Sequence, residues 1–433
     1  MARRDALTAL FAGLAAIVTL LVALIVWVNL RGEAPIGDAV VDVTPQLVER
    51  GAYLARAGNC AACHTARGGA PYAGGRAIDT PFGVVFGSNL TPDPEHGLGR
   101  WNADHFWRAM HHGRSRDGRL LNPAFPYPNF TRITRADSDA LFAYLRSLPA
   151  VAQPNRAHEL DFPFSTQAAL AVWRALYFRA ARVEPNTNRT AEHERGAYLV
   201  QGLAHCSACH GARNALGATA QADELKTFGG ALMPLQDWYA PSLLRADEAA
   251  LADWPVDDVV ALLKTGVSPR GSVLGPMAEV VFGSTQHLSD ADVRAMATYL
   301  QSLPQQPPAP VRLRRVEPAQ MRVGSEIYEA RCAGCHGKAG EGARLEGSFS
   351  AVRVIPPLAG NRAVTMHPPA NVIRVVLSGG YPPATAGNPR PFGMPPLGQD
   401  LNDAEVAAVV TFIRNSWGHQ AGAVRQHEVA RLR

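Results

Sequence analysis

The longest run of apolar residues in the chain stands at its N-terminus. Residues Ala6–Leu30 contain no charged side chain, and their clearly polar members are Thr8, Thr19 and Asn29. A helix of 25 residues is long enough to cross a bilayer's hydrocarbon core, which is about 30 Å thick. Arg3 and Arg4 precede the run, and positive residues before a span favour a cytoplasmic N-terminus. The pattern predicts an N-terminal transmembrane helix, with the rest of the chain in the periplasm.

A cleaved signal peptide is the alternative interpretation of this segment. Signal peptides have an apolar region of about 7–15 residues that ends at a small-residue cleavage site. Here the apolar run is longer and continues into Trp27–Arg31. We therefore favour an uncleaved anchor, and cleavage stays the alternative.

Beyond this run, the pattern of apolar and polar residues repeats three times. Three segments carry apolar residues at helical spacing after an initial Ser, Asp or Asn: Asp137–Leu148, Ser289–Leu303 and Asn402–Trp417. We refer to these as the closing helices. A shorter segment with a Gly and a Tyr stands at the start of each copy, and we refer to it as the leading helix: Glu49–Leu54, Glu194–Leu199 and, more loosely, Val323–Tyr328. The recurring Gly suits a close crossing of the two helices in each copy.

These repeats predict a mainly α fold of three tandem domains behind the N-terminal helix. The boundaries that we expect are a membrane anchor and linker at 1–44, a first domain at 45–152, a linker at 153–189, a second domain at 190–304, a Pro-rich linker at 305–317, and a third domain with a tail at 318–433. The stretch Pro304–Pro310 reads as a stiff, extended spacer.

The linker between the first two domains contains one more amphipathic segment. Residues Ser165–Arg182 predict a helix with one apolar face, formed by Leu170, Trp173, Leu176 and Tyr177. We expect this face to pack against a neighbouring domain. A contact with the membrane surface or with a partner protein is the alternative.

Composition narrows the class of protein further. The chain has 433 residues, which fits three domains of about 100–150 residues each. It contains 39 Gly and 33 Pro but only 18% charged residues, and its formal net charge is +5. No dense run of Lys and Arg with interleaved aromatic residues occurs, which argues against nucleic-acid binding.

All six cysteines stand in three copies of one motif, Cys-x-x-Cys-His, the attachment signature of haem c. Cysteines at positions i and i+3 lie on one face of a helical turn and can reach the two vinyl groups of a haem. The histidine that follows offers a ring nitrogen to the iron. We predict three covalently bound haem c groups, attached at Cys60, Cys63, Cys206, Cys209, Cys332 and Cys335, with the proximal iron ligands His64, His210 and His336.

Zinc binding and disulfide pairing are the simpler explanations of such cysteine pairs. A zinc site would need a second pair of ligands near each motif, and none has suitable spacing. A disulfide framework needs no histidine after each pair. The repeated histidine therefore favours haem attachment.

The sixth iron ligand decides what each haem can do, because a methionine there raises the reduction potential. Met277 and Met394 stand beside proline, each shortly before the closing helix of its domain. A loop methionine can also fill an apolar gap. The matching positions in two copies favour ligation by both methionines.

The first domain departs from this pattern. Phe125 stands about where the methionine is expected, and no Met follows in this domain. Met110 aligns with Leu263, which predicts a place in the core. His111 and His112 come next. The candidates for the sixth ligand of the first haem are His111, His112 and Met110, and a haem with no sixth ligand is the remaining alternative. A bis-histidine site would have a lower potential than the other two.

The chain resembles the membrane-bound tri-haem cytochrome c subunits of bacterial alcohol and gluconate dehydrogenases. The resemblance covers residues 45–418 and rests on the three haem motifs together with Thr80–Gly83, Ser88–Pro94, Ser115–Arg119, Pro126-Tyr127 and Ala407–Trp417. Two features depart from the family: Phe125 replaces its usual Met, and the N-terminal span looks like an anchor rather than a cleaved signal. Relatives with phenylalanine there resemble cytochrome subunits paired with molybdenum hydroxylases.

The resemblance implies an electron-transfer subunit that is not an enzyme on its own. Its partner would be a dehydrogenase of flavin, quinone-cofactor or molybdenum type, and its acceptor ubiquinone or a terminal oxidase. Two other functions fit the sequence. An open first haem would suit a peroxidase-like enzyme, and the relay could belong to a terminal oxidase.

Overall fold

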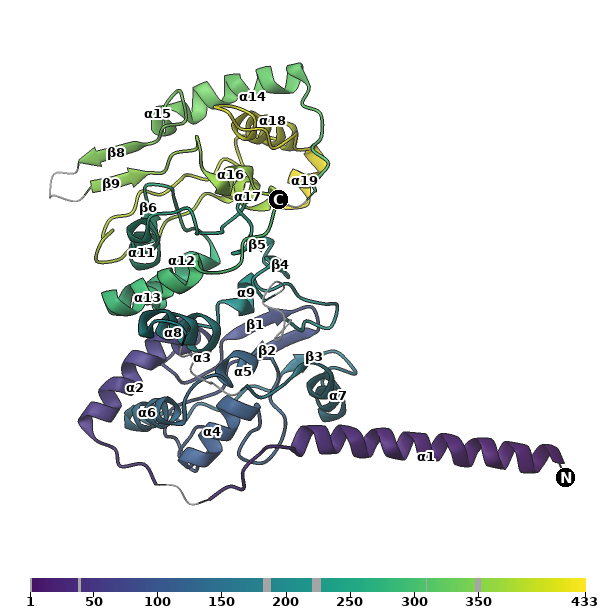
Figure 1. Ribbon diagram of the computed structural model, residues 1–433. Coiled ribbons are helices and arrows are strands. Elements are labelled where there is room, and N and C mark those ends of the chain that lie inside the picture. The colour runs from purple at the N-terminus through teal and green to yellow at the C-terminus, as the bar shows by residue number, and fades with distance from the viewer. Residues whose placement is uncertain (1, 38–39, 182–187, 220–226, 309, 347–351) are drawn as a thin grey trace.

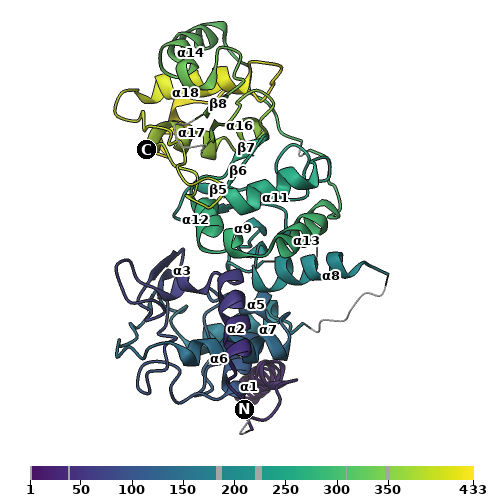
Figure 2. The ribbon, with the colours of Figure 1, turned by 90° about the vertical axis from the view of Figure 1, so that its left-hand side faces the viewer.

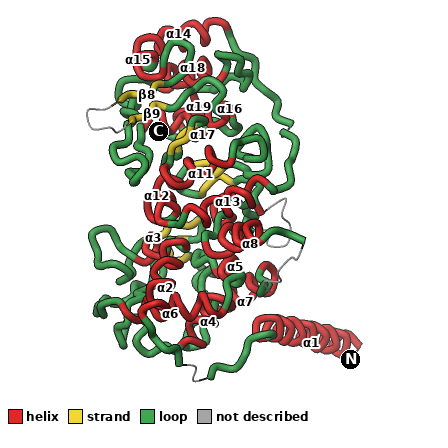
Figure 3. Tube along the Cα trace, turned by 60° about the vertical axis from the view of Figure 1, so that its left-hand side comes forward, coloured by secondary structure: helices red, strands yellow, loops and turns green. Residues whose placement is uncertain are grey.

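The protein is described by a computed structural model that covers residues 2–37, 40–181, 188–219, 227–308, 310–346 and 352–433. Three helical units are stacked along one direction, and the long helix α1 (Ala2–Leu30) leaves the first unit sideways (Figures 1 and 2). Helices dominate and the strands are short, as the tube in Figure 3 makes plain. The prediction of a mainly α fold behind an N-terminal helix is confirmed.

The first unit is built around the leading helix and the closing helix predicted from the sequence. Its helices are α2 (Pro45–Ala57), α3 (Cys60–His64), α4 (Ala103–His112), α5 (Tyr127–Phe130) and α6 (Arg135–Ser147). A small antiparallel sheet has the order β1 (Ala77–Thr80), β2 (Gly83–Phe86) and β3 (Glu159–Leu160). After it comes α7 (Gln167–Tyr177), which is shorter than the predicted helix; residues 182–187 lie outside the described residues.

The second and third units repeat this plan with small antiparallel strand pairs. The second contains α8 (Ala191–Ala197), the π-helical turn η1 (Tyr198–Leu203), α9 (Ser207–His210), β4 (Ala231–Met233), β5 (Trp238–Ala240), α11 (Val256–Thr265), β6 (Val267–Ser268), β7 (Gly271–Ser272), α12 (Pro276–Gly283), the 3₁₀ turn η2 (Thr285–His287) and α13 (Asp290–Gln301). The third contains α14 (Pro318–Arg331), α15 (Ala333–His336), β8 (Ala343–Glu346), β9 (Val352–Ile355), α16 (Arg362–Thr365), α17 (Ala370–Ser378), α18 (Asp403–Arg414) and α19 (Gln426–Ala430).

In every unit the leading helix crosses the closing helix at a glycine. The crossing pairs are α2 with α6, α8 with α13, and α14 with α18. A Cβ on the glycine would lie 2.0–2.3 Å from a carbonyl oxygen of the closing helix: Gly51 at Ala140, Gly196 at Ala295 and Gly324 at Ala408. Only glycine fits such an approach of two backbones. An aromatic residue also borders each glycine: Tyr144, Tyr299 and Phe412. The expected close crossing is thus present in all three copies.

The first two units pack together through a reciprocal set of contacts. The hydroxyl of Tyr53 donates to Asp292 of the second unit, and the hydroxyl of Tyr198 donates to Asp137 of the first. Each acceptor also pairs with an arginine of its own unit, Arg50 for Asp137 and Arg195 for Asp292. The equivalent residues exchange places across the interface, so the two units are related by an approximate two-fold axis. Their buried apolar residues form one continuous core.

The third unit docks on the second through different residues and has a core of its own. The side chain of Asn371 bonds both backbone groups of Tyr239, each at 2.8 Å. Arg362 donates to the carbonyl of Ala250 at 2.9 Å and pairs with Asp253. The stack therefore combines one symmetric junction with one asymmetric junction.

The glycine crossing can be tested in the second unit by Gly196→Ala. The added methyl group would collide with the Ala295 carbonyl, so α8 and α13 would have to move apart. Overpacking of this kind costs about 1–3 kcal/mol, and urea unfolding should show that loss.

Gly202→Ala is the matched control because it lies six residues further along the same helical segment. There the nearest atom to the new Cβ is 3.4 Å away. Alanine in a helix is about 1 kcal/mol more favourable than glycine, and this gain applies to both variants, so the collision is what distinguishes them. Equal stability of the two variants would contradict the proposed role of the crossing.

Candidate haem-binding sites

The three predicted iron ligands share one hydrogen-bonding geometry. Nδ1 of His64 lies 2.7 Å from the carbonyl oxygen of Ser88. The other two follow the same plan: His210 with Pro241 at 2.7 Å and His336 with Pro356 at 3.2 Å. A carbonyl oxygen only accepts, so Nδ1 carries the proton and donates it. Each ring therefore keeps the Nε2 lone pair for a metal, which is the usual arrangement of a metal-binding histidine.

Burial acts on these rings in the same direction. It lowers the pKa of His64, His210 and His336, and the hydrogen bond to the carbonyl opposes this shift only in part. The rings therefore favour the neutral form, in which Nε2 can bind iron.

A glycine in a left-handed conformation fixes the backbone after each histidine. Its amide donates to the carbonyl of the histidine at 2.8–2.9 Å: Gly74 to His64, Gly230 to His210 and Gly342 to His336. The φ angles of these glycines are +80°, +80° and +71°, and a Cβ would lie 2.5–2.7 Å from backbone atoms. Only glycine satisfies both conditions.

Sequence reasoning missed these glycines and the carbonyls that hold Nδ1. The glycines stand at different distances from their histidines, so no fixed spacing reveals them. One sequence signal could have located these loops. A leucine stands two residues after each residue whose carbonyl accepts the Nδ1 hydrogen bond, namely Leu90, Leu243 and Leu358. The backbone amide of each leucine donates a hydrogen bond to a carbonyl earlier in the chain: Leu90 to Tyr72, Leu243 to Phe228 and Leu358 to Gly340.

The cysteines of each motif lie on one helical turn beside the histidine. In the first motif both belong to α3, and in the other two the first cysteine caps the helix, α9 or α15. None of the six pairs with another in a disulfide. Burial raises the pKa of Cys60 and Cys206 to about 12. Two thiols and one imidazole on a single turn match the donor set that haem c requires, so these residues fit the group.

Each candidate distal methionine lies on the same core as a cysteine of its motif. Met394 packs against the core that contains Cys332, and Met277 and Cys206 both pack against the core that the first two units share. The backbone of Met394 is fixed by two hydrogen bonds with Gly380, at 2.8 and 3.0 Å. Met277 is the second residue of α12. Both side chains are half-buried, not exposed.

In the first unit Phe125 takes part in a cluster of aromatic rings. Its ring lies 5.3 Å from that of Phe130 and 6.5 Å from that of Tyr127. Met110 is buried in the core, as is its counterpart Leu263. The expectation of a core role for Met110 is thus supported.

The two neighbouring histidines have different surroundings. His111 stacks on Trp107 at 4.4 Å, and its buried Nδ1 has no hydrogen-bond partner among the described residues. His112 is buried, and its carbonyl accepts a hydrogen bond from Arg174. Burial lowers the pKa of both rings to about 4. Both are therefore neutral near pH 7, and the alternatives for the first haem stay open.

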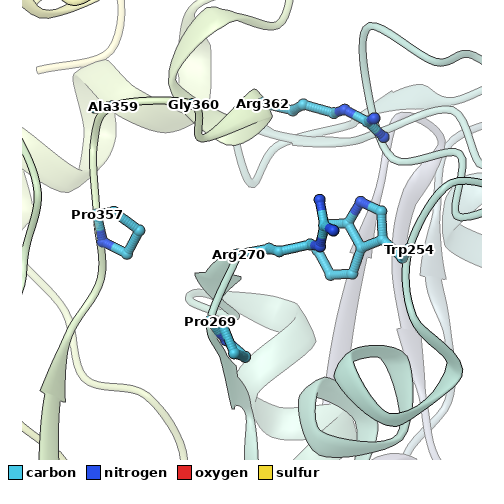
Figure 4. Close-up of a pocket in the computed structure, with 7 residues that line it drawn as sticks. All are labelled: Trp254, Pro269, Arg270, Pro357, Ala359, Gly360 and Arg362. Atoms are coloured by element: carbon cyan, nitrogen blue, oxygen red, sulfur yellow. The ribbon is translucent and has the colours of Figure 1, made fainter.

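A cavity of about 130 Å³ lies at the junction of the second and third units (Figure 4). Its lining is Trp254, Pro269, Arg270, Pro357, Ala359, Gly360 and Arg362. Both guanidinium groups are engaged, since Arg362 pairs with Asp253 and Arg270 pairs with Asp258 at 3.1 Å. This cavity belongs to the packing between units.

Several proteins of named function are similar in sequence to most of this chain. The chain is 38% identical, over 411 residues, to the cytochrome c subunit of a quinone-dependent alcohol dehydrogenase from Gluconacetobacter polyoxogenes; this covers 90% of the chain and 85% of the relative. It is 36% identical over 404 residues to the gluconate 2-dehydrogenase cytochrome c subunit of Pantoea cypripedii, covering 89% of each. One component of the nicotinate dehydrogenase of Pseudomonas putida is 40% identical over 375 residues, which are 85% of the chain but 30% of that protein.

The sequence pattern of the cytochrome c family matches three separate stretches, residues 48–149, 193–304 and 322–417. Each stretch contains one Cys-x-x-Cys-His motif with its leading and closing helices. The chain therefore belongs to the cytochrome c family, and covalently bound haem c is the prosthetic group that this membership implies.

Proposed function

We propose that this chain relays electrons from a partner dehydrogenase to ubiquinone or a terminal oxidase through three haem c groups. The observation that carries the proposal is the threefold repetition of one ligand geometry. Each of His64, His210 and His336 donates Nδ1–H to a carbonyl and follows two cysteines on one helical turn that form no disulfide. The relatives named as cytochrome c subunits of dehydrogenases support the partner.

Each haem would be held within one domain. The attaching cysteines are Cys60 with Cys63, Cys206 with Cys209, and Cys332 with Cys335, in domains that we place at 45–152, 190–304 and 318–433. When bound, haem c supplies an iron that accepts and releases one electron at a time. The residues of the chain orient the proximal imidazoles, and they would shield a bound haem from water and tune its potential through the distal ligand. We assign Met277 and Met394 as two of those ligands.

The N-terminal helix would keep the relay at the cytoplasmic membrane, with the domains in the periplasm. One helix among the described residues, Arg4–Leu30, is long and apolar enough to span a bilayer, a test that a signal sequence also passes. Arg3 and Arg4 before it favour a cytoplasmic N-terminus.

The partner would oxidise a small organic substrate, and its class is open among flavin, quinone-cofactor and molybdenum dehydrogenases. Relatives of this chain are named for alcohol, gluconate and nicotinate dehydrogenases. The substrate is therefore a property of the partner, because this chain supplies only the path for electrons.

The relay can be tested by purifying the tagged full-length chain from solubilised membranes of its natural host. We expect a larger dehydrogenase subunit to co-purify, and we expect the substrate of that subunit to reduce the haem absorbance bands. Co-purification with a copper–haem oxidase and no dehydrogenase would contradict the proposal, as would rapid peroxide turnover by the isolated chain.

The distal methionines can be tested with variants of nearly equal volume. Leucine cannot bind iron, so Met394→Leu and Met277→Leu should each lower the potential of one haem and weaken the near-infrared methionine–iron absorption band. Met366→Leu is the control, because Met366 is a buried core residue of the third domain. Potentiometric titration gives the potentials. An unchanged absorption band in the double variant would refute the assignment.

The loop that follows His336, the proximal ligand of the third domain, can be tested with two glycines that share a backbone conformation. Gly342 and Gly360 have φ angles of +71° and +70°, so alanine costs about 1–2 kcal/mol of backbone strain at either position. Only at Gly342 does the new Cβ also collide, 2.5 Å from the carbonyl oxygen of Ile355. Gly342→Ala should therefore be the less stable variant and should speed amide hydrogen exchange around His336. Equal exchange in both variants would show that the loop does not hold the ligand.

A further inference from the structure

The end of α1 is fixed to the first domain by side chains, not only through the linker that follows. Asn29 is 7% exposed, and its Nδ2 donates to the carbonyl of Ala171 on α7 at 2.9 Å. Its Oδ1 accepts a hydrogen bond from Arg174, also on α7, at 2.9 Å. The carbonyl of Asn29 accepts a third hydrogen bond from Arg114 at 3.0 Å. One polar residue near the end of an apolar helix thus connects α1 to two parts of the domain.

The arginine that receives this contact is itself held in place. Arg174 is 4% exposed, and its guanidinium lies over the rings of Tyr127 and Phe178, at 5.5 and 4.6 Å from their centres. It also donates to the carbonyl of His112. A buried cation with these partners fixes the position of α7 relative to α1. Any orientation of α1 in a bilayer is therefore transmitted to α7 and to the first domain.

The length of α1 places this junction at the surface of the bilayer. The candidate span Arg4–Leu30 has 27 residues, about 40 Å at 1.5 Å per residue, whereas the hydrocarbon core is about 30 Å thick. The C-terminal turn of α1 would then lie among the lipid headgroups. There Arg31 lies over the ring of Trp27, 5.2 Å from its centre, and Trp and Arg are typical residues of this zone.

The helix that contacts this turn presents apolar side chains to solvent. On α7, Val172 is 43% exposed and Leu176 is 57% exposed; at positions i and i+4 they lie on the same face. In the segment that leads into α7, Phe162 is 85% exposed. Arg31 and Arg179 are exposed near the two helices and would meet lipid phosphates. In Figure 1, α7 lies on the flank from which α1 leaves the body.

We infer that α7 is an interfacial helix that rests on the same bilayer that α1 crosses. This inference rests on the proposed membrane anchorage and adds a second contact to it. Val172 and Leu176 would lie at the boundary between headgroups and acyl chains, where such apolar side chains gain free energy from leaving water. The occupant is lipid rather than a partner protein, because the exposed face borders the end of the spanning helix.

Two consequences follow for the position of the domains. The first domain rests against the membrane and does not move freely on a tether. Because α1 leaves the body across the direction in which the units are stacked (Figures 1 and 2), the stack runs along the membrane surface.

Photocrosslinking of the full-length haem-containing protein in native membranes tests this contact. A photoreactive residue is placed at one position at a time by Val172→p-benzoylphenylalanine and Leu176→p-benzoylphenylalanine. Leu14→p-benzoylphenylalanine reports on α1, and Tyr381→p-benzoylphenylalanine is the control, because Tyr381 is an exposed residue of the third domain. Unchanged haem spectra confirm folding, and mass spectrometry of the irradiated peptides identifies the adducts.

We expect lipid adducts at positions 14, 172 and 176, and none at position 381. Lipid adducts at position 14, combined with only protein adducts or no adducts at 172 and 176, would overturn the interfacial helix and leave the anchor intact. The absence of lipid adducts at position 14 would overturn the anchorage itself and the inference with it.

Discussion

The contact of two helix backbones at a glycine is the constraint on which each domain depends. At Gly51, Gly196 and Gly324 the leading helix touches a carbonyl of the closing helix, and no side chain fits between them. The leading helix ends just before the Cys-x-x-Cys-His turn. Its crossing therefore determines where that turn faces the loop that binds the histidine. The same backbone contact thus packs the two helices together and also positions the Cys-x-x-Cys-His turn.

The two junctions between domains divide the chain into a pair and a third member. The first two domains share one core and exchange Tyr–Asp hydrogen bonds, Tyr53 with Asp292 and Tyr198 with Asp137. Hydrogen bonds from Arg195 and Tyr53 lower the pKa of Asp292 although burial raises it, so the carboxylate is charged in the folded protein. The third domain docks through Asn371 and Arg362. Packing between the domains would therefore fix the distances between the proposed haem groups, and the rate of electron transfer depends on those distances.

The sequence predicts those parts of the fold and of the candidate sites that depend on local spacing. The haem motifs, the three closing helices and the apolar span are all read from short windows, and the structure has a helix at each closing segment and at the span. The loops that bind Nδ1 could not be predicted in this way, because Gly74, Gly230 and Gly342 follow their histidines at unequal distances in the sequence. The role of Asn29 could not be predicted either, because a polar residue in an apolar run gives no information about Arg174, which stands 145 residues away.

The central claim is that three haem groups are attached to this one chain, and the intact mass of the mature protein tests it most directly. The account predicts the mass of the polypeptide, with the N-terminal helix retained, plus three haem groups that survive denaturation. A bare chain, or a chain with fewer than three attached groups, would contradict it.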